Sequence, residues 1–329
     1  MVKGVKGLIM NKEMKVEFCN NIEELVDLTL SKDEYLIKVK YAPINPADFY
    51  TLTGNYRIKM IPNSMTGLEG CGEIVEVGPE GDKTVIGKIC NFTFSDFRYG
   101  SYSTFTKVSK NNTVIIPNAD ESFHKRNSFI ANPLTALGLL NFLEKQGGKA
   151  FVNTGASSSV GKQILQWSKG KFSSINLVRN DKHKETLTKL GATVVINTTS
   201  KTYKDELKKS IKELKPTMAF DAVAGSTTGD VFNLLPDNSE LCVYGTLSLE
   251  RCQNISPAEL IFKKKSIYGF HLREFTGIGS ISNFSEQLIE FYKEYDNYPE
   301  GYDTLSIKDY GKAMAMYMKK KRPILLSFD

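Results

Sequence analysis

The pattern of apolar and polar positions changes about a third of the way along the chain. Up to about residue 118, runs that alternate apolar and polar residues, or are rich in β-branched residues, are separated by Gly, Pro and Asn. This pattern predicts strands and an all-β, barrel-like region. The expected strands are Tyr35–Tyr41, Gly72–Val77, Lys88–Phe92, Tyr102–Val108 and Thr113–Ile116.

After residue 127, a Leu- and Ala-rich segment predicts a helix over Pro133–Glu144, and short apolar runs then alternate with helical segments such as Asp181–Leu190 and Lys204–Leu214. The runs are nearly continuous in apolar residues, as burial on both faces requires, which predicts an α/β, doubly wound parallel sheet. Its strands are expected at Ala150–Asn153, Ile175–Val178, Thr193–Ile196, Met218–Val223, Leu241–Tyr244 and Ser266–Tyr268. The tail, with helices over Phe284–Tyr295 and Ile307–Lys320 and a strand over Ile324–Phe328, is expected to return to the first domain.

Composition narrows the classes of protein. The 329 residues exceed what one hydrophobic core organises, so two domains are expected. Basic and acidic residues number 43 and 37 and are interspersed, which argues against a nucleic-acid partner. The five cysteines form no CxxC pair and are expected to be reduced thiols. The start of the chain shows neither a signal-peptide core nor an Arg-rich presequence, and no run reaches membrane-spanning length. We expect a soluble, cytoplasmic protein with no membrane partner, and a mitochondrial location stays open.

The segment from Ala150 to Gly161 predicts a strand, a tight turn and a helix, which is how dinucleotide-binding units hold a pyrophosphate. Such a turn usually has three glycines. The first and last are present as Gly155 and Gly161, and Ser158 occupies the middle position. A small residue still lets backbone N–H groups approach a phosphate, and serine hydroxyls can donate to it. The alternative is a serine-rich loop that caps an ordinary helix, with Ser159 as the N-cap. The residues expected at the phosphates are Gly155, Ser157, Ser158, Ser159, Val160 and Gly161.

Arg179 follows the second strand of this unit, where such folds place the residue that meets the adenosine ribose. An NADH-preferring enzyme usually has an acid there, whereas a guanidinium suits a 2′-phosphate. Arg179 therefore predicts NADPH as the cofactor. Lys182 is expected to reinforce it, and a solvent-facing lysine is the alternative.

Further cofactor contacts are expected where later strands end, because the cofactor lies at the carboxyl edge of such a sheet. Gly225 ends one strand, and Gly245 and Thr246 end the next. Phe270 and His271 follow the last strand, and their backbone groups are expected near the carboxamide.

Several separated segments, APINPADFYTLTGNY, GLEGCGEIVEVG, NPLTALGLL and NTGASSSVGK, resemble the medium-chain dehydrogenase/reductase superfamily over nearly the whole chain. The resemblance implies a GroES-like β-barrel catalytic domain over residues 1–122, completed by 271–329, and a Rossmann domain over 123–270. At the zinc-ligand positions of the family's alcohol dehydrogenases this chain has Asn45-Pro46 and Leu68-Glu69, and its three histidines are far apart in sequence. We therefore expect no metal. The nearest resemblance is to the zinc-free branch of 2-enoyl thioester reductases and quinone oxidoreductases.

This resemblance implies an NADPH-dependent reductase of a C=C conjugated to a carbonyl, with an enoyl thioester as substrate. An NADPH:quinone oxidoreductase and a non-catalytic NADPH-binding subunit of a larger assembly stay open as alternatives. Tyr56 in Gly-Asn-Tyr is the implied proton donor, with a packing role as its alternative and Tyr50 as a weaker candidate. Asn45 is implied at the nicotinamide ribose and Thr135 near the nicotinamide.

Two further expectations rest on the same resemblance. The chain is expected to form a homodimer through the sheet edge near Ser266–Tyr268. His271 occupies a position where the enoyl reductases tend to have tryptophan, so the acyl pocket is expected to be more polar than theirs.

Overall fold

The computed structural model describes residues 2–56, 59–94, 96, 98–117, 121–275, 280–294, 301–320 and 323–328. The chain forms two compact units, each described here by itself. Unit 1 comprises Met1–Ala131 and Thr276–Asp329, and unit 2 comprises Asn132–Phe275. No helix in these ranges is both long and apolar enough to cross a membrane.

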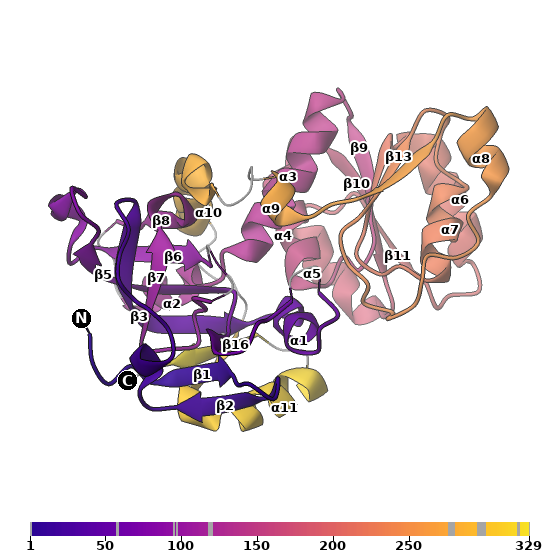
Figure 1. Cartoon of the computed structure of the whole chain (residues 1–329). Helices are drawn as coiled ribbons and strands as arrows, with labels where there is room; N and C mark the ends of the chain where they lie inside the picture. Colours follow the sequence, from indigo (N-terminus) through magenta and orange to yellow (C-terminus); the bar gives the residue numbers. More distant parts are fainter. Residues whose placement is uncertain are drawn as a thin grey trace. The chain divides into compact units, whose positions relative to one another are not determined.

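Unit 1 is built on two sheets (Figure 1). The larger has seven strands in the order β15-β16-β3-β5-β6-β8, with β7 also paired to β3, and the smaller has the order β2-β1-β4. Most pairs are antiparallel, and β15 with β16 is parallel. The strands are β1 (Gly7–Met10), β2 (Val16–Cys19), β3 (Glu34–Ile44), β4 (Ser64–Met65), β5 (Glu69–Val77), β6 (Ile89–Thr93), β7 (Phe105–Ser109), β8 (Thr113–Ile115), β15 (Asp303–Ser306) and β16 (Ile324–Ser327).

The C-terminal tail contributes directly to this sheet, because β16 pairs with β3. Its helices are α10 (Ser285–Glu294) and α11 (Tyr310–Lys320), and the earlier helices of unit 1 are α1 (Pro46–Leu52) and α2 (Glu121–Asn127). Ile307–Lys320 was expected to be one helix, but β15 and a 3-10 turn precede α11. Tyr295, the expected end of α10, lies outside the described residues.

Unit 2 is a six-stranded sheet whose pairs are all parallel, in the order β11-β10-β9-β12-β13-β14. The order of the chain reverses between β9 and β12. Doubly wound folds bind ligands in the crevice at the carboxyl ends of the strands beside such a switch point. The strands are β9 (Ala150–Asn153), β10 (Ser173–Val178), β11 (Val194–Asn197), β12 (Met218–Asp221), β13 (Glu240–Val243) and β14 (Ser266–Gly269). The doubly wound architecture predicted from the apolar runs is confirmed.

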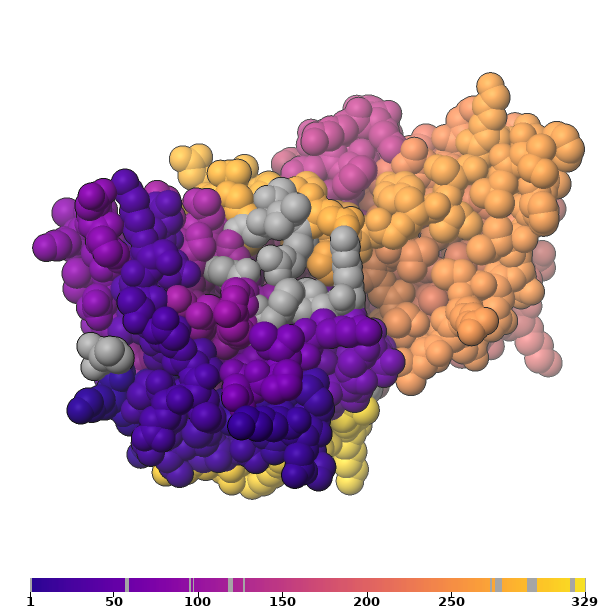
Figure 2. Space-filling view, in the orientation of Figure 1, coloured from indigo at the N-terminus to yellow at the C-terminus, as the bar shows by residue number. Residues whose placement is uncertain are grey.

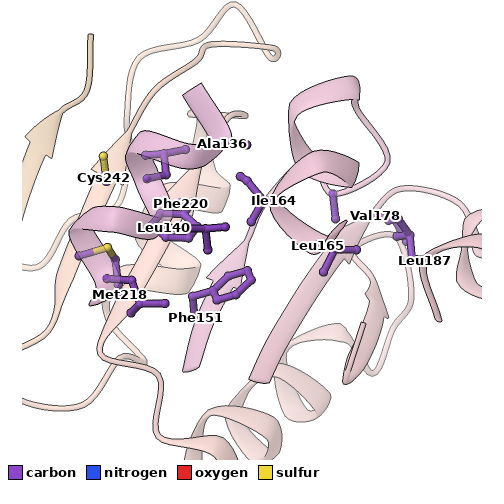
Figure 3. Close-up of a cluster of buried hydrophobic side chains, with 13 residues drawn as sticks. Ala136, Leu140, Phe151, Ile164, Leu165, Val178, Leu187, Met218, Phe220 and Cys242 are labelled. Atoms are coloured by element: carbon purple, nitrogen blue, oxygen red, sulfur yellow. The ribbon is translucent and has the colours of Figure 1, made fainter. Parts of the chain in front are cut away.

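Helices cover both faces of this sheet. On one face, α3 (Ala131–Lys145), α4 (Ser159–Ser168) and α5 (Lys184–Lys189) bury a cluster that includes Leu140, Ile164 and Phe151. Figure 3 shows these side chains pointing from helices and strands toward one another. On the other face, α6 (Tyr203–Leu214) and α7 (Ser226–Phe232) pack with the sheet through residues such as Leu207 and Phe232. These two hydrophobic clusters hold the strands in place and so position their carboxyl ends.

Candidate dinucleotide site and candidate catalytic residues

The turn after β9 has the geometry that a phosphate site needs. Gly155 has a φ of 60°, a conformation that glycine adopts without strain. Gly161 is buried, and a Cβ added to it would lie 2.7 Å from the Cα and carbonyl oxygen of Ala156. Both glycines are therefore required by the backbone, and the first turn of α4 can come close to a bound group.

The three serines of this turn do not share one role. Ser158 is the N-cap of α4, and its hydroxyl accepts a hydrogen bond from the Gly161 N–H at 3.1 Å. The alternative interpretation named Ser159 as the cap, which is wrong, because Ser159 is already the first helical residue. Ser157, Ser159 and Val160 are half-buried around the cap. As an acceptor, Ser158 keeps its own hydroxyl hydrogen for a phosphate oxygen.

Arg179 directly follows β10, and its side chain is exposed. Among the described residues no carboxylate pairs with it. The nearest acid in sequence, Asp181, instead accepts a hydrogen bond from Asn197 at 2.9 Å and forms an ion pair with Lys184 at 2.8 Å. The guanidinium is therefore available to an external anion, and its assignment to a 2′-phosphate stays a prediction.

More positive charge lies beside Arg179 than the sequence analysis expected. Lys182 is exposed and likewise has no ion pair within the described ranges. The pKa of His183 is lowered, first by burial and then by the charges of Lys182 and Lys162, so these three side chains are neighbours. Lys162 lies in the first turn of α4, one residue after Gly161. Two consecutive βα connections therefore contribute basic residues to this end of the unit.

The other strand ends lie at the same edge. Gly225 (φ 65°) is the N-cap of α7, and a Cβ on Gly245 would lie 2.9 Å from the carbonyl oxygen of Ala222. Thr246 is exposed. The Phe270 N–H donates to the Val243 carbonyl at 2.9 Å, and its ring packs beside Phe275. His271 follows, half-buried, and its carbonyl accepts from the N–H of Glu274 at 3.0 Å.

In unit 1, Asn45 joins two buried carboxyl groups. Its backbone N–H donates to Asp48 at 2.8 Å, and its side-chain amide donates to Glu69 at 2.6 Å. The other oxygen of Glu69 accepts from the N–H groups of Ile130 and Ala131 at 2.9 and 2.6 Å. Burial raises the pKa of Asp48 to about 7 and that of Glu69 to about 7. Asn45 is the N-cap of α1, and Asp48 at the third helical position completes the capping box.

These contacts also explain where unit 1 ends. Glu69 holds the backbone that leads into α3, and α2 lies against β5. The stretch from 121 to 131 is therefore part of unit 1, and the limit lies further along the chain than the predicted one at residue 122. Sequence reasoning took Glu69 only as a position where zinc enzymes have a ligand, and its hydrogen bonds show what it does here.

Tyr56 is half-buried and follows the turn that ends α1. That turn is formed by Gly54, with a φ of 71°, and by the N–H of Asn55, which donates to the Tyr50 carbonyl at 2.8 Å. Thr135 lies in the second turn of α3 and is half-buried. The assignment of Tyr56 and Thr135 to the site stays a prediction. Within the described residues, no three His, Cys, Asp or Glu side chains converge as metal ligands.

Comparison with known proteins agrees with this architecture. Residues 31–118 match the alcohol dehydrogenase GroES-like domain family, and residues 144–294 match the zinc-binding dehydrogenase family. Mitochondrial enoyl-[acyl-carrier-protein] reductases are similar in sequence. That of Arabidopsis thaliana is 25% identical over 86% of this chain and 76% of its own length, and that of Dictyostelium discoideum is 29% identical over 77% and 73%.

Solved structures with the same fold include a putative NADPH:quinone reductase from Mesorhizobium loti, with a TM-score of 0.85 and 22% identity. The mitochondrial 2-enoyl thioester reductase heterodimer from Candida tropicalis has a TM-score of 0.82 and 23% identity. Both likenesses cover the whole of each chain.

The fold, the phosphate turn and these matches define an oxidoreductase of the medium-chain dehydrogenase/reductase superfamily, to which the chain belongs. Within that superfamily it falls in the zinc-free branch that holds the enoyl thioester reductases and quinone oxidoreductases. The resemblance seen in the sequence is confirmed.

Proposed function

We propose that this chain is an NADPH-dependent reductase of a C=C bond conjugated to a thioester carbonyl. The observation that carries the cofactor assignment is the exposed Arg179 guanidinium, which no described carboxylate neutralises, at the end of β10. The similar enoyl-[acyl-carrier-protein] reductases support the substrate class, and a related Candida tropicalis structure is a complex with NADP and crotonyl-CoA.

The residues present fit a dinucleotide. Gly155, Ser158 and Gly161 would hold the pyrophosphate through backbone N–H groups and a hydroxyl, and Arg179 with Lys182 would hold the 2′-phosphate. A Cβ at Gly161 would fill the space that the close approach requires. Bound NADPH supplies the hydride that reduces the β-carbon of the substrate.

The chain must then control a proton. Reduction at the β-carbon leaves an enolate, which hydrogen-bond donors stabilise and which takes a proton at the α-carbon. A phenol with a reference pKa near 10 keeps its proton at neutral pH and can still give it to a basic enolate. We assign the proton on the Tyr56 hydroxyl to this step. Asn45, whose amide Glu69 holds, is proposed to orient the nicotinamide ribose.

The test is a titration of the purified protein with NADPH and NADH, followed by crotonyl-CoA and, separately, a benzoquinone, while nicotinamide absorbance is recorded. NADPH-selective binding with oxidation on adding crotonyl-CoA is expected. Turnover with the quinone alone would favour the quinone oxidoreductase instead. Tight NADPH binding without turnover on either acceptor would favour a non-catalytic cofactor-binding subunit.

A second copy of the chain is the proposed partner, at the β14 edge of the sheet. β14 pairs on one side with β13, and no described strand pairs with its other side, whose backbone groups are therefore open to a partner strand. In the sequence, α8 (Pro257–Phe262) shortly precedes β14, and this part of the chain is orange in Figure 2. It exposes 67% of Ile261 and 78% of Phe262. Symmetric pairing of two β14 strands is proposed to cover both the open backbone groups of β14 and the exposed side chains of α8. Phe262→Glu should lower the mass measured by light scattering from dimer to monomer, and a monomeric wild type would refute the pairing.

A further inference from the structure

Asp221 is the last residue of β12, and its carboxylate is fully buried. One oxygen accepts hydrogen bonds from the Thr154 hydroxyl at 2.7 Å and from the N–H groups of Val223 and Ala224 at 2.9 and 3.1 Å. The other oxygen accepts from the Thr228 hydroxyl at 2.6 Å. Four donors thus converge on one charged group, and hydrogen bonds to a charged group are roughly twice as strong as neutral ones.

Thr154 connects the end of β9 to the end of β12 through hydrogen bonds of its side chain. It follows β9 and directly precedes Gly155, and its hydroxyl also accepts from the Ala222 N–H at 2.9 Å. The two residues therefore join the carboxyl ends of β9 and β12, the neighbouring strands at which the chain order reverses. A crevice at this switch point is where doubly wound folds place a dinucleotide. The distance between these two strand ends is therefore fixed by side-chain hydrogen bonds.

The same aspartate fixes the loop that borders the crevice. Ala224 has a φ of 62°, a left-handed conformation that strains an L-residue, and Gly225 follows with a φ of 65°. The hydrogen bonds from Ala224 and Thr228 to Asp221 hold this strained turn at both ends. Strained backbone persists only where its surroundings over-determine it, and such sites cluster at ligand clamps.

The backbone of Asp221 reaches a third strand end. Its carbonyl accepts from the N–H of Tyr244 at 2.9 Å, and the carbonyl of Ala222 accepts from the N–H of Leu247 at 2.9 Å. Three consecutive walls of the crevice, after β9, β12 and β13, are thus tied to one residue. None of these contacts reaches Arg179, which follows β10 on the far side of β9.

We infer that Asp221 is a positioning residue for the dinucleotide: its carboxylate holds the turn after β9 and the 222–228 loop in the geometry that accepts the cofactor. This inference rests on the proposed NADPH binding. The inference divides the site into two parts. The adenosine 2′-phosphate would contact Arg179, whereas the pyrophosphate and nicotinamide ribose would contact the turn after β9 and the 222–228 loop, which Asp221 holds.

The experiment compares Asp221→Ala and Asp221→Asn with the wild type, using NADPH and adenosine 2′,5′-bisphosphate as separate probes in fluorescence and calorimetric titrations. Asp221→Ala should lower the affinity for NADPH by about tenfold or more. The affinity for the bisphosphate should fall by about twofold at most, because the lost hydrogen bonds hold only the turn after β9 and the 222–228 loop. Asp221→Asn keeps one acceptor oxygen and can donate to Thr228, so most of the NADPH affinity should return.

Leu207→Ala is the matched control. Leu207 is fully buried where α6 packs on the sheet, and it makes none of the hydrogen bonds of Asp221 described above. It should lower the melting temperature without changing either dissociation constant for the folded protein. If Asp221→Ala binds NADPH as tightly as the wild type, or loses both probes equally, the inference is overturned. If the wild type binds neither probe, the proposed function itself fails, which is a different outcome.

Discussion

Removal of the Arg179 guanidinium tests the cofactor assignment most directly. A charge-assisted hydrogen bond is worth about 1.5–3 kcal/mol. Arg179 is exposed, so solvent screens it, but no described carboxylate competes for it. We therefore expect the lower end of this range, about 1.5 kcal/mol, which is about a tenfold rise in the dissociation constant of NADPH for Arg179→Ala. NADH has no 2′-phosphate, so its affinity should stay within about twofold.

The assay is a titration of nicotinamide fluorescence with both cofactors at low and high salt. The preference of the wild type for NADPH should shrink as salt rises, and the variant should show a weaker salt dependence, because one screened contact is gone. Lys208→Ala, which removes another exposed cation from α6, is the control and should change neither cofactor. An equal loss of NADPH and NADH affinity in Arg179→Ala would refute a contact between this side chain and the 2′-phosphate.

Three further predictions concern other parts of the molecule. Gly161→Ala should abolish NADPH binding in the same titration and lower the free energy of unfolding by about 1–3 kcal/mol, because its Cβ would overlap Ala156; wild-type affinity would contradict this geometry. Tyr56→Phe should lower turnover of crotonyl-CoA about 100-fold with unchanged NADPH affinity, and an unchanged rate would exclude its hydroxyl from the proton step. The raised pKa of Asp48, about 7, means that the folded state holds a proton that the unfolded chain releases above about pH 4, so the free energy of unfolding should fall as pH rises through 7. Asp48→Asn should remove a share of this fall on the order of 3 kcal/mol between pH 5 and 8 in urea unfolding, and an identical pH profile would show that Asp48 does not titrate there.

Local pattern was sufficient for the parts of the fold in which neighbours in sequence are also neighbours in space. The apolar runs located all six strands of unit 2, within one or two residues at most ends. Gly155 and Gly161 located the tight turn between β9 and α4, because its backbone geometry depends on a few consecutive residues. Short elements with weak patterns, such as β1, β2, β15 and α7, were not predicted, because their pairing and packing partners stabilise them more than their own residues do.

The anchoring of buried carboxylates could not be read from the chain. Glu69 accepts from backbone groups 61 and 62 residues away, and Asp221 accepts from Thr154, which lies 67 residues earlier. The sequence separation between these partners follows no motif, because the contacts depend on which segments the fold brings together. Lys162 was missed for the same reason, because it lies on the β9–α4 connection, whereas Arg179 and His183 lie on the connection after β10.

The sequence by itself determined the two kinds of domain, the tight turn after β9 and the basic residue after β10, because each depends on residues that act within a few positions of one another. The tertiary structure decided that Ser158 and not Ser159 caps α4, that Arg179 has no described carboxylate partner, and that Asp221 joins three strand ends. These features depend on strand order and burial, where hydrogen bonds between distant residues offset the cost of removing charge from water.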